Sequence, residues 1–225
     1  MSESVRAEQL GESRAAFMAR VRQAVGRRGQ AESMETAPEV DEALVRLVSP
    51  QDDVVELFTR RATAAGMRVY HVDNTGVAGT VTEIVRAAGA GRVAVAVDGL
   101  MAHLREAGAT VVDRVDGNAA LWELDAAVTG VTAAIAETGT LVCCSDAQQG
   151  RLLSLLAPVH VAIVRSSDVV ADMLDYWDRF GGDGAGPVAS SQVMITGPSK
   201  TSDIEGVLIT GVHGPGEVHV VVVDP

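Results

Sequence analysis

Hydrophobic and polar residues alternate in blocks along the chain, in a rhythm typical of strands separated by helices. Valine-rich runs at residues 93–97 and 218–223 have the composition of strands that are buried on both faces. In the first half of the chain we expect strands at residues 67–71, 93–97 and 110–112 and helices at residues 79–88 and 100–106. This alternation predicts βαβ units, and therefore an α/β fold with an open, mostly parallel sheet.

Two further helices are predicted before this region. Apolar residues recur at helical spacing over residues 5–27, which predicts an N-terminal amphipathic helix, and residues 29–38 lack any period and resemble a linker. Ser49 followed by Pro50 is a typical helix start, so the next helix is expected to run from Ser49 to residue 65 and to end at Gly66. We therefore divide the chain into an arm with its linker, residues 1–38, and an α/β domain, residues 39–225.

The second half of the chain has longer apolar runs. Residues 127–136 predict one long strand, and Ser167 is expected to open a helix that reaches residue 180. Further strands are expected at residues 141–144, 160–164, 192–196 and 217–223, with a flexible loop at residues 181–187.

Charge and composition narrow the function classes. The formal net charge is −12, which argues against nucleic acid as a partner because phosphate binding needs a basic surface. The first thirty residues are locally basic, which suits either the solvated face of an arm helix or a docking surface. No apolar stretch approaches the roughly 20 residues that span a bilayer, and no signal peptide is visible after Met1.

The two cysteines, Cys143 and Cys144, are adjacent in the sequence. On a strand their side chains point to opposite faces, so they cannot ligate one metal ion together. The five histidines are scattered, without thiolates or carboxylates at metal-ligand spacing, so we expect no metal site. A reducing, cytoplasmic compartment is the simplest interpretation of two unpaired cysteines.

The first candidate for chemistry is the turn Glu137-Thr138-Gly139-Thr140 between two expected strands. A glycine there allows a tight turn or a close approach to a ligand, and a carboxylate at a strand end suits a base, a nucleophile or a hydrogen-bond acceptor. The same pattern also fits a hairpin turn with a solvated acid. Arg151, beside Gly150 and before an apolar run, is a second candidate, either as an anion ligand or as an ion-pair partner of Glu137.

The third candidate is the polar loop at residues 196–206, which follows a strand and contains the only lysine of the sequence. Successive backbone N–H groups in such a loop can hold an anion, especially where a helical turn begins at Thr201 or Ser202. The spacing is not that of a P-loop. The fourth candidate is His213, between glycines in Gly211-Val212-His213-Gly214-Pro215.

Four segments of the chain together carry a resemblance to a known family. They are Ala136-Glu137-Thr138-Gly139-Thr140-Leu141, residues 150–160, residues 197–206, and residues 211–220. In this order they resemble the LUD-domain (lactate-utilisation) family, strongly over the last hundred residues and loosely over residues 40–124. The resemblance implies an open α/β sheet similar to that of the glucosamine-6-phosphate deaminase, ribose-5-phosphate isomerase and CoA-transferase group.

The resemblance also implies a part in oxidising L-lactate to pyruvate, beside two partner subunits that look like iron–sulfur oxidoreductases. The sequence lacks both a C-x₂-C-x₂-C-x₃-C-P run and a G-x-G-x-x-G motif after a strand. We therefore expect no cofactor on this chain and assign the redox chemistry to the iron–sulfur partners.

Two functions stay open from the sequence. One is a non-redox subunit of an L-lactate-oxidising complex that binds a small anionic ligand. The other is a free-standing acyl- or CoA-transferase-like enzyme, since related CoA transferases use a glutamate in a Glu-x-Gly turn as nucleophile and Glu137-Thr138-Gly139 is similar to that turn. Glu137 is then the candidate catalytic residue, and the candidate ligand-binding residues are Thr138, Gly139, Thr140, Arg151, Gly197, Ser199, Lys200, Thr201, Asp203, Glu205, His213 and Gly214. A third interpretation makes both loops structural turns.

Overall fold

The computed structural model describes residues 13–26, 41–112, 118–146, 149–180, 189–204 and 207–225. The chain divides into two units, Met1–Leu44 and Val45–Pro225. In the first unit, helix α2 (Arg14–Ala24) begins after Ser13, whose hydroxyl accepts a hydrogen bond of 3.2 Å from the Ala16 N–H. The predicted arm helix is thus described from Arg14 onward, and the predicted linker lies outside the described residues. The apolar side chains of Phe17 and Val21 are exposed within this unit.

The second unit is built on a six-stranded sheet, in which the strand order is β1-β12-β7-β4-β2-β3 and every neighbouring pair is parallel. Its strands are β1 (Arg68–Asp73), β2 (Arg92–Val95), β3 (Thr110–Val112), β4 (Ala126–Gly130), β7 (Val159–Arg165) and β12 (Glu217–Asp224). The predicted α/β class and its parallel sheet are confirmed. The two valine runs lie in β2 and β12, which are interior strands of this sheet and have both faces covered.

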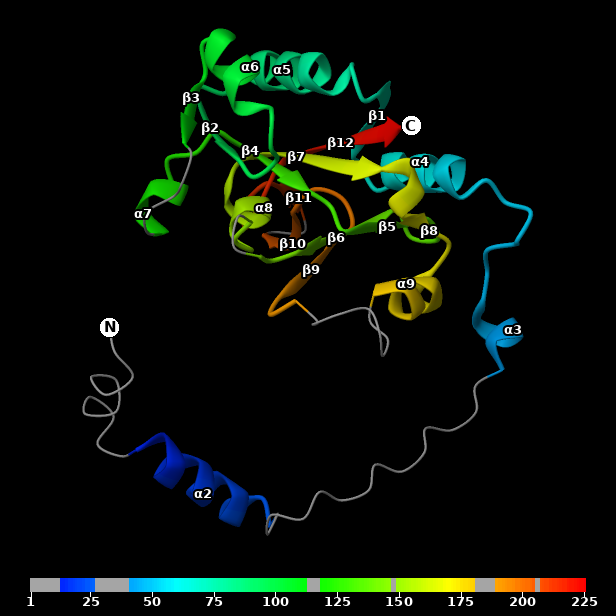
Figure 1. The fold of residues 1–225 in the computed structure, drawn as a ribbon, viewed down its shortest axis with the longest axis vertical. Helices are drawn as coiled ribbons and strands as arrows, with labels where there is room; N and C mark the ends of the chain where they lie inside the picture. Colours follow the sequence, from blue (N-terminus) through cyan, green and yellow to red (C-terminus); the bar gives the residue numbers. More distant parts are fainter. Residues whose placement is uncertain (1–12, 27–40, 113–117, 147–148, 181–188, 205–206) are drawn as a thin grey trace. The chain divides into compact units, whose positions relative to one another are not determined.

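Helices cover one face of this sheet. Helices α5 (Val77–Ala87) and α6 (Met101–Glu106) lie together on it, as Figure 1 shows. Their buried residues pack against strands β2, β4, β7 and β12 in one apolar cluster that includes Val81, Ile84 and Leu104. The short helices α7 (Asn118–Leu121) and α8 (Leu153–Leu156) belong to the opposite side, where Leu121 packs with Ala127 and Ala157.

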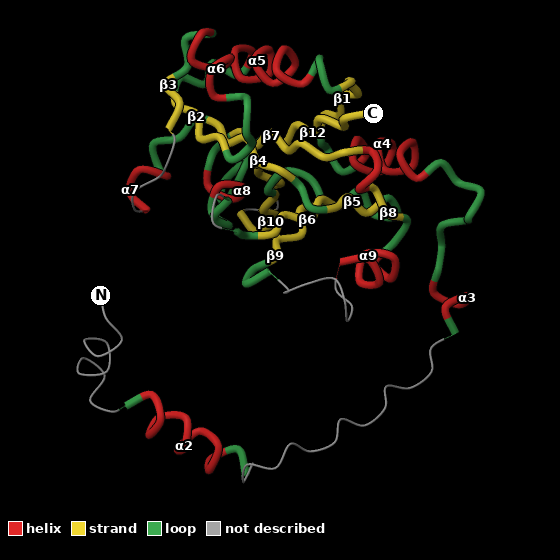
Figure 2. The backbone as a smooth tube through the Cα atoms, viewed as in Figure 1, coloured by secondary structure: helices red, strands yellow, loops and turns green. Residues whose placement is uncertain are grey.

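A second sheet and helix α4 (Val54–Ala64) cover the other face of the parallel sheet. This sheet has the order β8-β5-β6-β9, with strands β5 (Ala133–Ile135), β6 (Thr140–Cys144), β8 (Val169–Val170) and β9 (Gln192–Ile195). The apolar layer between the two sheets combines Phe58 of α4 with residues of both, such as Leu141 and Val220. Helix α9 (Met173–Phe180) lies on the far side of the second sheet (Figure 2). Its residue Tyr176 packs with Ile135 and Val142 of that sheet.

The prediction of one long strand at residues 127–136 is wrong, because the chain passes from one sheet to the other inside this run. The Val131 N–H donates to the Ile163 carbonyl of β7, whereas the next N–H, that of Thr132, donates to the Val142 carbonyl of β6. Both halves of the run are buried, so the apolar pattern is the same before and after the change of sheet.

The prediction of a helix from Ser167 to residue 180 is also wrong in its first half. Residues there form a 3₁₀ turn, η1 (Ser166–Asp168), and then strand β8, which pairs with β5. Helix α9 begins only after Asp172, whose carboxylate Oδ1 accepts a hydrogen bond of 2.9 Å from the Asp175 N–H. Burial of Val169 and Val170 in the second sheet outweighs the helical pattern that their neighbours suggest.

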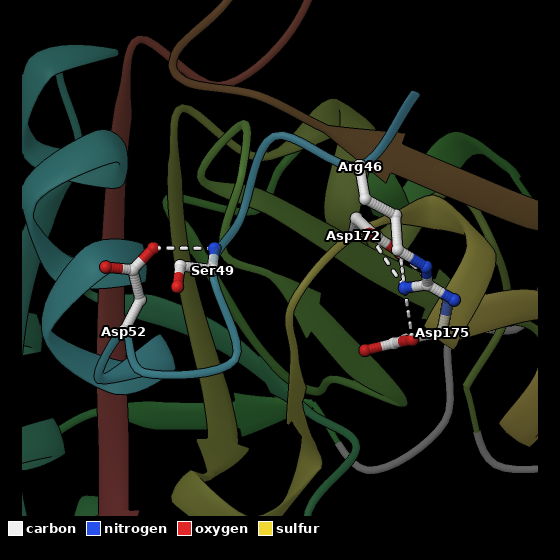
Figure 3. A network of polar contacts seen from close by, with 5 residues as sticks. All are labelled: Arg46, Ser49, Asp52, Asp172 and Asp175. Atoms are coloured by element: carbon white, nitrogen blue, oxygen red, sulfur yellow. Dashed lines mark hydrogen bonds and ion pairs between the residues drawn. The ribbon is translucent and has the colours of Figure 1, made fainter. Parts of the chain in front are cut away.

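Helix α4 begins later than Ser49, the predicted N-cap. Asp53 is the N-cap instead, and its Oδ1 accepts hydrogen bonds from the N–H groups of Val55 and Glu56. Residue 49 lies in a turn in which the Ser49 N–H donates to the Asp52 carboxylate at 2.9 Å (Figure 3). The predicted end is confirmed, since α4 closes at Ala65 and Gly66 has a φ of +100°.

The loop predicted at residues 196–206 is in part a β-hairpin. Strands β10 (Lys200–Ile204) and β11 (Val207–Thr210) pair antiparallel, so the helical turn expected at Thr201 or Ser202 is not formed. The short helix α3 (Glu42–Val45) completes the described elements. No helix in the described ranges is long and apolar enough to cross a membrane.

Candidate functional site

The predicted turn Glu137-Thr138-Gly139 is the tip of the β5–β6 hairpin, and it packs on helix α4. Gly139 has a φ of +68°, and a Cβ added to it would lie 2.4 Å from the Ala62 nitrogen. Only glycine allows both this backbone conformation and this approach. The Glu137 N–H donates to the Ala171 carbonyl at 2.9 Å, so the turn is also tied to the strand β8 side of the sheet.

The second predicted loop lies at the C-terminal end of the same helix. Gly197 has a φ of +90°, and an added Cβ would lie 2.5 Å from the Ala65 carbonyl oxygen. The Lys200 ammonium donates a hydrogen bond of 2.9 Å to that same carbonyl. A cation here satisfies a terminal carbonyl of α4 and complements the negative end of the helix dipole.

Three threonine hydroxyls join the two loops. Thr140 Oγ1 lies 2.6 Å from Thr138 Oγ1 and 2.7 Å from Thr196 Oγ1, in a chain of hydrogen bonds. The two loops therefore do converge, but on the backbone of α4. Neither Glu137 nor Arg151 forms an ion pair with the other within the described ranges, where Glu137 is half-buried and Arg151 is exposed.

Ser199 connects the second loop to the segment 211–216. The Ser199 N–H donates to the Pro215 carbonyl at 2.9 Å, and the Ser199 carbonyl accepts from the Gly211 N–H at 2.8 Å. Further along, the Gly216 N–H donates to the Pro158 carbonyl at 2.9 Å. The two ends of the segment are thus fixed by backbone hydrogen bonds, while its middle, Val212 to Gly214, makes none within the described residues.

A pocket of about 600 Å³ lies beside this segment. It is lined by Ala88, Trp122, Leu155, Leu156, Pro158, Val159, Gly211, Val212, His213, Gly214, Gly216 and Glu217. Val159 and Glu217 are the first residues of β7 and β12, so the pocket lies at the amino ends of these parallel strands. Open α/β sheets more often bind ligands at the carboxyl ends of their strands. The pocket is therefore at the opposite edge of the sheet from the usual one.

Glu217 is the carboxylate of the pocket lining, and its charge is balanced by its neighbours. Arg68 donates a hydrogen bond to Glu217 and lies 3.3 Å from His219 Nε2. Burial acts to raise the pKa of Glu217, but the hydrogen bond and positive charge of Arg68 outweigh it and lower this pKa below its ordinary value. Glu217 is therefore a carboxylate held in an ion pair at neutral pH.

His219 lies behind Glu217 and is almost fully buried. Its ring stacks on Tyr70, with 5.8 Å between the ring centroids, and its Nδ1 lies 3.1 Å from the Tyr70 hydroxyl. Burial lowers the pKa of His219, so it stays neutral and supports the Arg68–Glu217 pair without adding charge.

The structure sorts the candidate residues into three groups. His213 and Gly214 line the pocket. Thr138, Gly139, Thr140, Gly197 and Lys200 are joined to one another or to α4, and Ser199 bridges the loop and the pocket segment. Thr201 and Asp203 lie on strand β10, and Glu205 lies outside the described residues.

Two residue sets were missed by the sequence reasoning. Trp122 lines the pocket with an exposed indole, and a lone aromatic in an apolar context gives no signal for this. Arg46 forms the second set: its Nη1 donates to Asp172 Oδ2 at 2.9 Å and to Asp175 Oδ1 at 2.6 Å (Figure 3). These contacts hold the chain before α4 against the start of α9. In the sequence, an aspartate followed three residues later by a second acid is the pattern that could have indicated this helix start.

Within the described ranges, no group of three or more His, Cys, Asp or Glu residues is placed to hold a metal ion. The arrangement is a pocket lined by apolar residues, by the segment that carries His213, and by Glu217, whose carboxylate is ion-paired with Arg68. This is the composition of a site for a small organic molecule.

Comparison with known proteins assigns the chain to a family. The LUD domain model matches residues 55–223, and the chain belongs to the LUD domain family. A protein from Deinococcus radiodurans called lactate utilization protein C is 38% identical over 113 residues, which are 47% of this chain and 50% of that protein. A protein of the same name from Anoxybacillus flavithermus is 28% identical over 182 residues, covering 77% of this chain and 81% of that protein.

A solved structure shares the fold. The crystal structure of a DUF162 family protein from Deinococcus radiodurans has a TM-score of 0.57 and 23% sequence identity, and the match covers 77% of this chain and 99% of that one. This likeness places the mostly parallel sheet and its flanking helices in a known architecture.

Proposed function

We propose that the protein acts in lactate utilisation, as a subunit of an L-lactate-oxidising assembly whose redox chemistry belongs to iron–sulfur partner subunits. The observation that carries this proposal is the family match over residues 55–223, together with relatives named lactate utilization protein C. The name belongs to those relatives, and we propose a role in lactate utilisation for this chain as well.

The cysteine content supports a non-redox role. A cluster of the ferredoxin type needs four thiolates, whereas the sequence has two cysteines, of which Cys143 is buried in strand β6. Burial raises the pKa of the Cys143 thiol to about 12, so it is not available as a thiolate ligand. In the proposed assembly, electrons therefore leave lactate through a partner.

The ligand of this subunit is proposed to be an organic anion that binds at the segment 211–216. Ser199 holds that segment in place through backbone hydrogen bonds, and His213 and Gly214 of the segment line the pocket. Arg68 balances the negative charge of the nearby Glu217. The remaining candidates, such as Lys200 and Gly139, are proposed to serve the ligand indirectly by fixing α4 and the loops around it.

A deletion of the gene in its own host, grown on L-lactate or on pyruvate as sole carbon source, tests the role. Loss of growth on L-lactate with normal growth on pyruvate is expected, because pyruvate enters metabolism after the oxidation step. A tagged copy of the chain should retain iron–sulfur proteins during purification, recognised by their visible absorbance and iron content. If the deletion strain grows as well on L-lactate as on pyruvate, the proposed role is wrong.

A further inference from the structure

We propose that the pocket at the amino ends of β7 and β12 binds an organic anion with a planar apolar body, which stacks on Trp122 and is larger than lactate. The inference rests on the anion-binding part of the proposed function and is independent of the role in lactate utilisation. Three properties of the pocket carry it: its open N–H groups, its exposed indole and its volume.

Val212, His213 and Gly214 line the pocket, and their N–H groups are assigned to its anion-binding side. None of them donates to an acceptor within the described residues. The segment that carries them is nevertheless fixed, because Ser199 is hydrogen-bonded to Gly211 at one end and to Pro215 at the other. Consecutive free N–H groups in a fixed backbone bind anions well, since little conformational entropy is lost on binding. The imidazole of His213 adds a further donor.

Trp122 forms the apolar side. Trp122 is 72% exposed, although an indole has a large apolar surface. It lines the pocket together with Leu155 and Pro158. A flat aromatic group on this indole removes apolar area from water on both partners and gains stacking energy. An exposed aromatic beside a concave apolar wall is typical of a ligand site.

The volume of the pocket sets the size of the ligand. At about 600 Å³ it falls among pockets that bind drug-sized molecules, for which roughly 300–1,000 Å³ is usual. A three-carbon acid such as lactate would contact only a small part of these walls. The ligand inferred here therefore carries its anionic group on a larger, ring-containing body.

The sign of the ligand charge follows from the groups around the pocket. Glu217 would repel an anion if it stood alone, but its carboxylate is paired with Arg68 and contacts His219 at 3.4 Å. With the charge of Glu217 balanced, the free N–H donors of the 211–216 segment favour an anion over a cation. We infer that a planar anion binds more tightly than a planar cation of the same size.

Matched naphthalene probes test this on the full-length protein. 1-Naphthoate should bind and raise Tm, whereas 1-naphthylmethylammonium and L-lactate at the same concentration should leave Tm unchanged. The two tryptophans, Trp122 and Trp177, allow the site to be located. In a Trp177→Phe variant, 1-naphthoate should quench the fluorescence of Trp122, and in a Trp122→Phe variant it should leave Trp177 unaffected, because Trp177 lies on α9 outside the pocket lining.

Substitutions then separate the two sides of the pocket. Trp122→Ala and His213→Ala should each raise the Kd for 1-naphthoate by about tenfold or more, with Trp177→Ala as the control that keeps the wild-type Kd. Equal binding of the cation, equal quenching of both tryptophans, or an unchanged Kd in both pocket variants would overturn the inference. If 1-naphthoate fails to bind while the deletion strain still loses growth on L-lactate, the pocket assignment falls and the role in lactate utilisation stands.

Discussion

The Lys200 ammonium lies 2.9 Å from the Ala65 carbonyl oxygen and donates a hydrogen bond to it at the C-terminal end of α4. Lys200 is the only lysine in the chain, and its sequence context suggested an anion ligand. In the folded protein it contacts the end of a helix on which the tips of both glycine-containing loops also pack. We therefore expect its contribution to be one of stability.

Lys200→Met removes the charge and keeps most of the apolar side-chain volume. Because the side chain is exposed, the expected loss in free energy of unfolding is small, about 0.5–1 kcal/mol, as for other cations at helix C-termini. Urea unfolding measures this loss, and Lys200→Arg should restore part of it. If the Lys200→Met protein keeps its full stability but no longer binds 1-naphthoate, the structural assignment of Lys200 is wrong.

Gly139→Ala and Gly197→Ala should both destabilise the protein strongly. Each places a Cβ within 2.4–2.5 Å of a backbone atom of α4 and forces alanine into a left-handed conformation. The conformation alone costs about 1–2 kcal/mol, and the displacement of the helix adds to that. Thermal unfolding should show a large decrease in Tm, or the variants should be recovered only in aggregated form.

Two other glycines provide matched controls for this prediction. Gly89 has a φ of +64° but open space around it, so Gly89→Ala should cost only the backbone strain. Gly79 lies inside helix α5 with open space and an ordinary φ, so Gly79→Ala should raise stability by about 0.5–1 kcal/mol. Equal losses for Gly89→Ala and Gly139→Ala would show that contact with α4 is unimportant.

Burial of His160 should make the free energy of unfolding depend on pH. It is fully buried between strands, with its Nε2 2.8 Å from Thr129 Oγ1, and burial lowers its pKa to about 4 from an ordinary value of 6.5. Between these two pH values the unfolded chain binds a proton that the folded chain does not, so stability falls as pH falls from about 6.5 to about 4. The full shift corresponds to roughly 3 kcal/mol.

Urea unfolding at a series of pH values measures this dependence. Above pH 6.5 the contribution is absent, because His160 is neutral in both states. His160→Gln should show a shallower decrease in this window than the wild type, whatever its stability at neutral pH. Parallel pH profiles for the two proteins would contradict the assignment.

The adjacent cysteines should differ in reactivity. Burial raises the pKa of Cys143 to about 12, whereas Cys144 is half-buried at the end of β6. A thiol reagent such as iodoacetamide should modify Cys144 first in the native protein, and both cysteines only after unfolding. Peptide mass spectrometry distinguishes the two sites, and rapid native labelling of Cys143 would mean that strand β6 opens.

Much of the parallel sheet could be predicted because its signal is local. The alternation of short apolar runs with helical patterns predicted β1, β2 and β3 to within a residue or two of their observed bounds. The break between β4 and β5 could not be predicted, since it is set by the strands that accept the N–H groups of Val131 and Thr132, which are β7 and β6. The partners of these N–H groups are distant in sequence, and the apolar pattern is the same on both sides of the break.

The candidate site was predictable only in part for a similar reason. Glycines at 139 and 197 were recognised as special, but a glycine that approaches a ligand and one that approaches a helix look the same in a sequence. His213 was recognised from its glycine neighbours and does line the pocket, whereas Trp122 joins it from a distant segment. The pocket itself arises from the order β12-β7 in the sheet, which is a property of the topology.

Complementation of the deletion strain tests most directly whether the pocket is the functional centre in lactate utilisation. Wild type, Lys200→Met, and the double variant Trp122→Ala/His213→Ala should be expressed to equal soluble levels, and growth on L-lactate should be measured. We predict that wild type and Lys200→Met restore growth, because the first has the pocket and the second leaves it intact, and that the double variant does not. Full growth of the double variant on L-lactate would contradict the account.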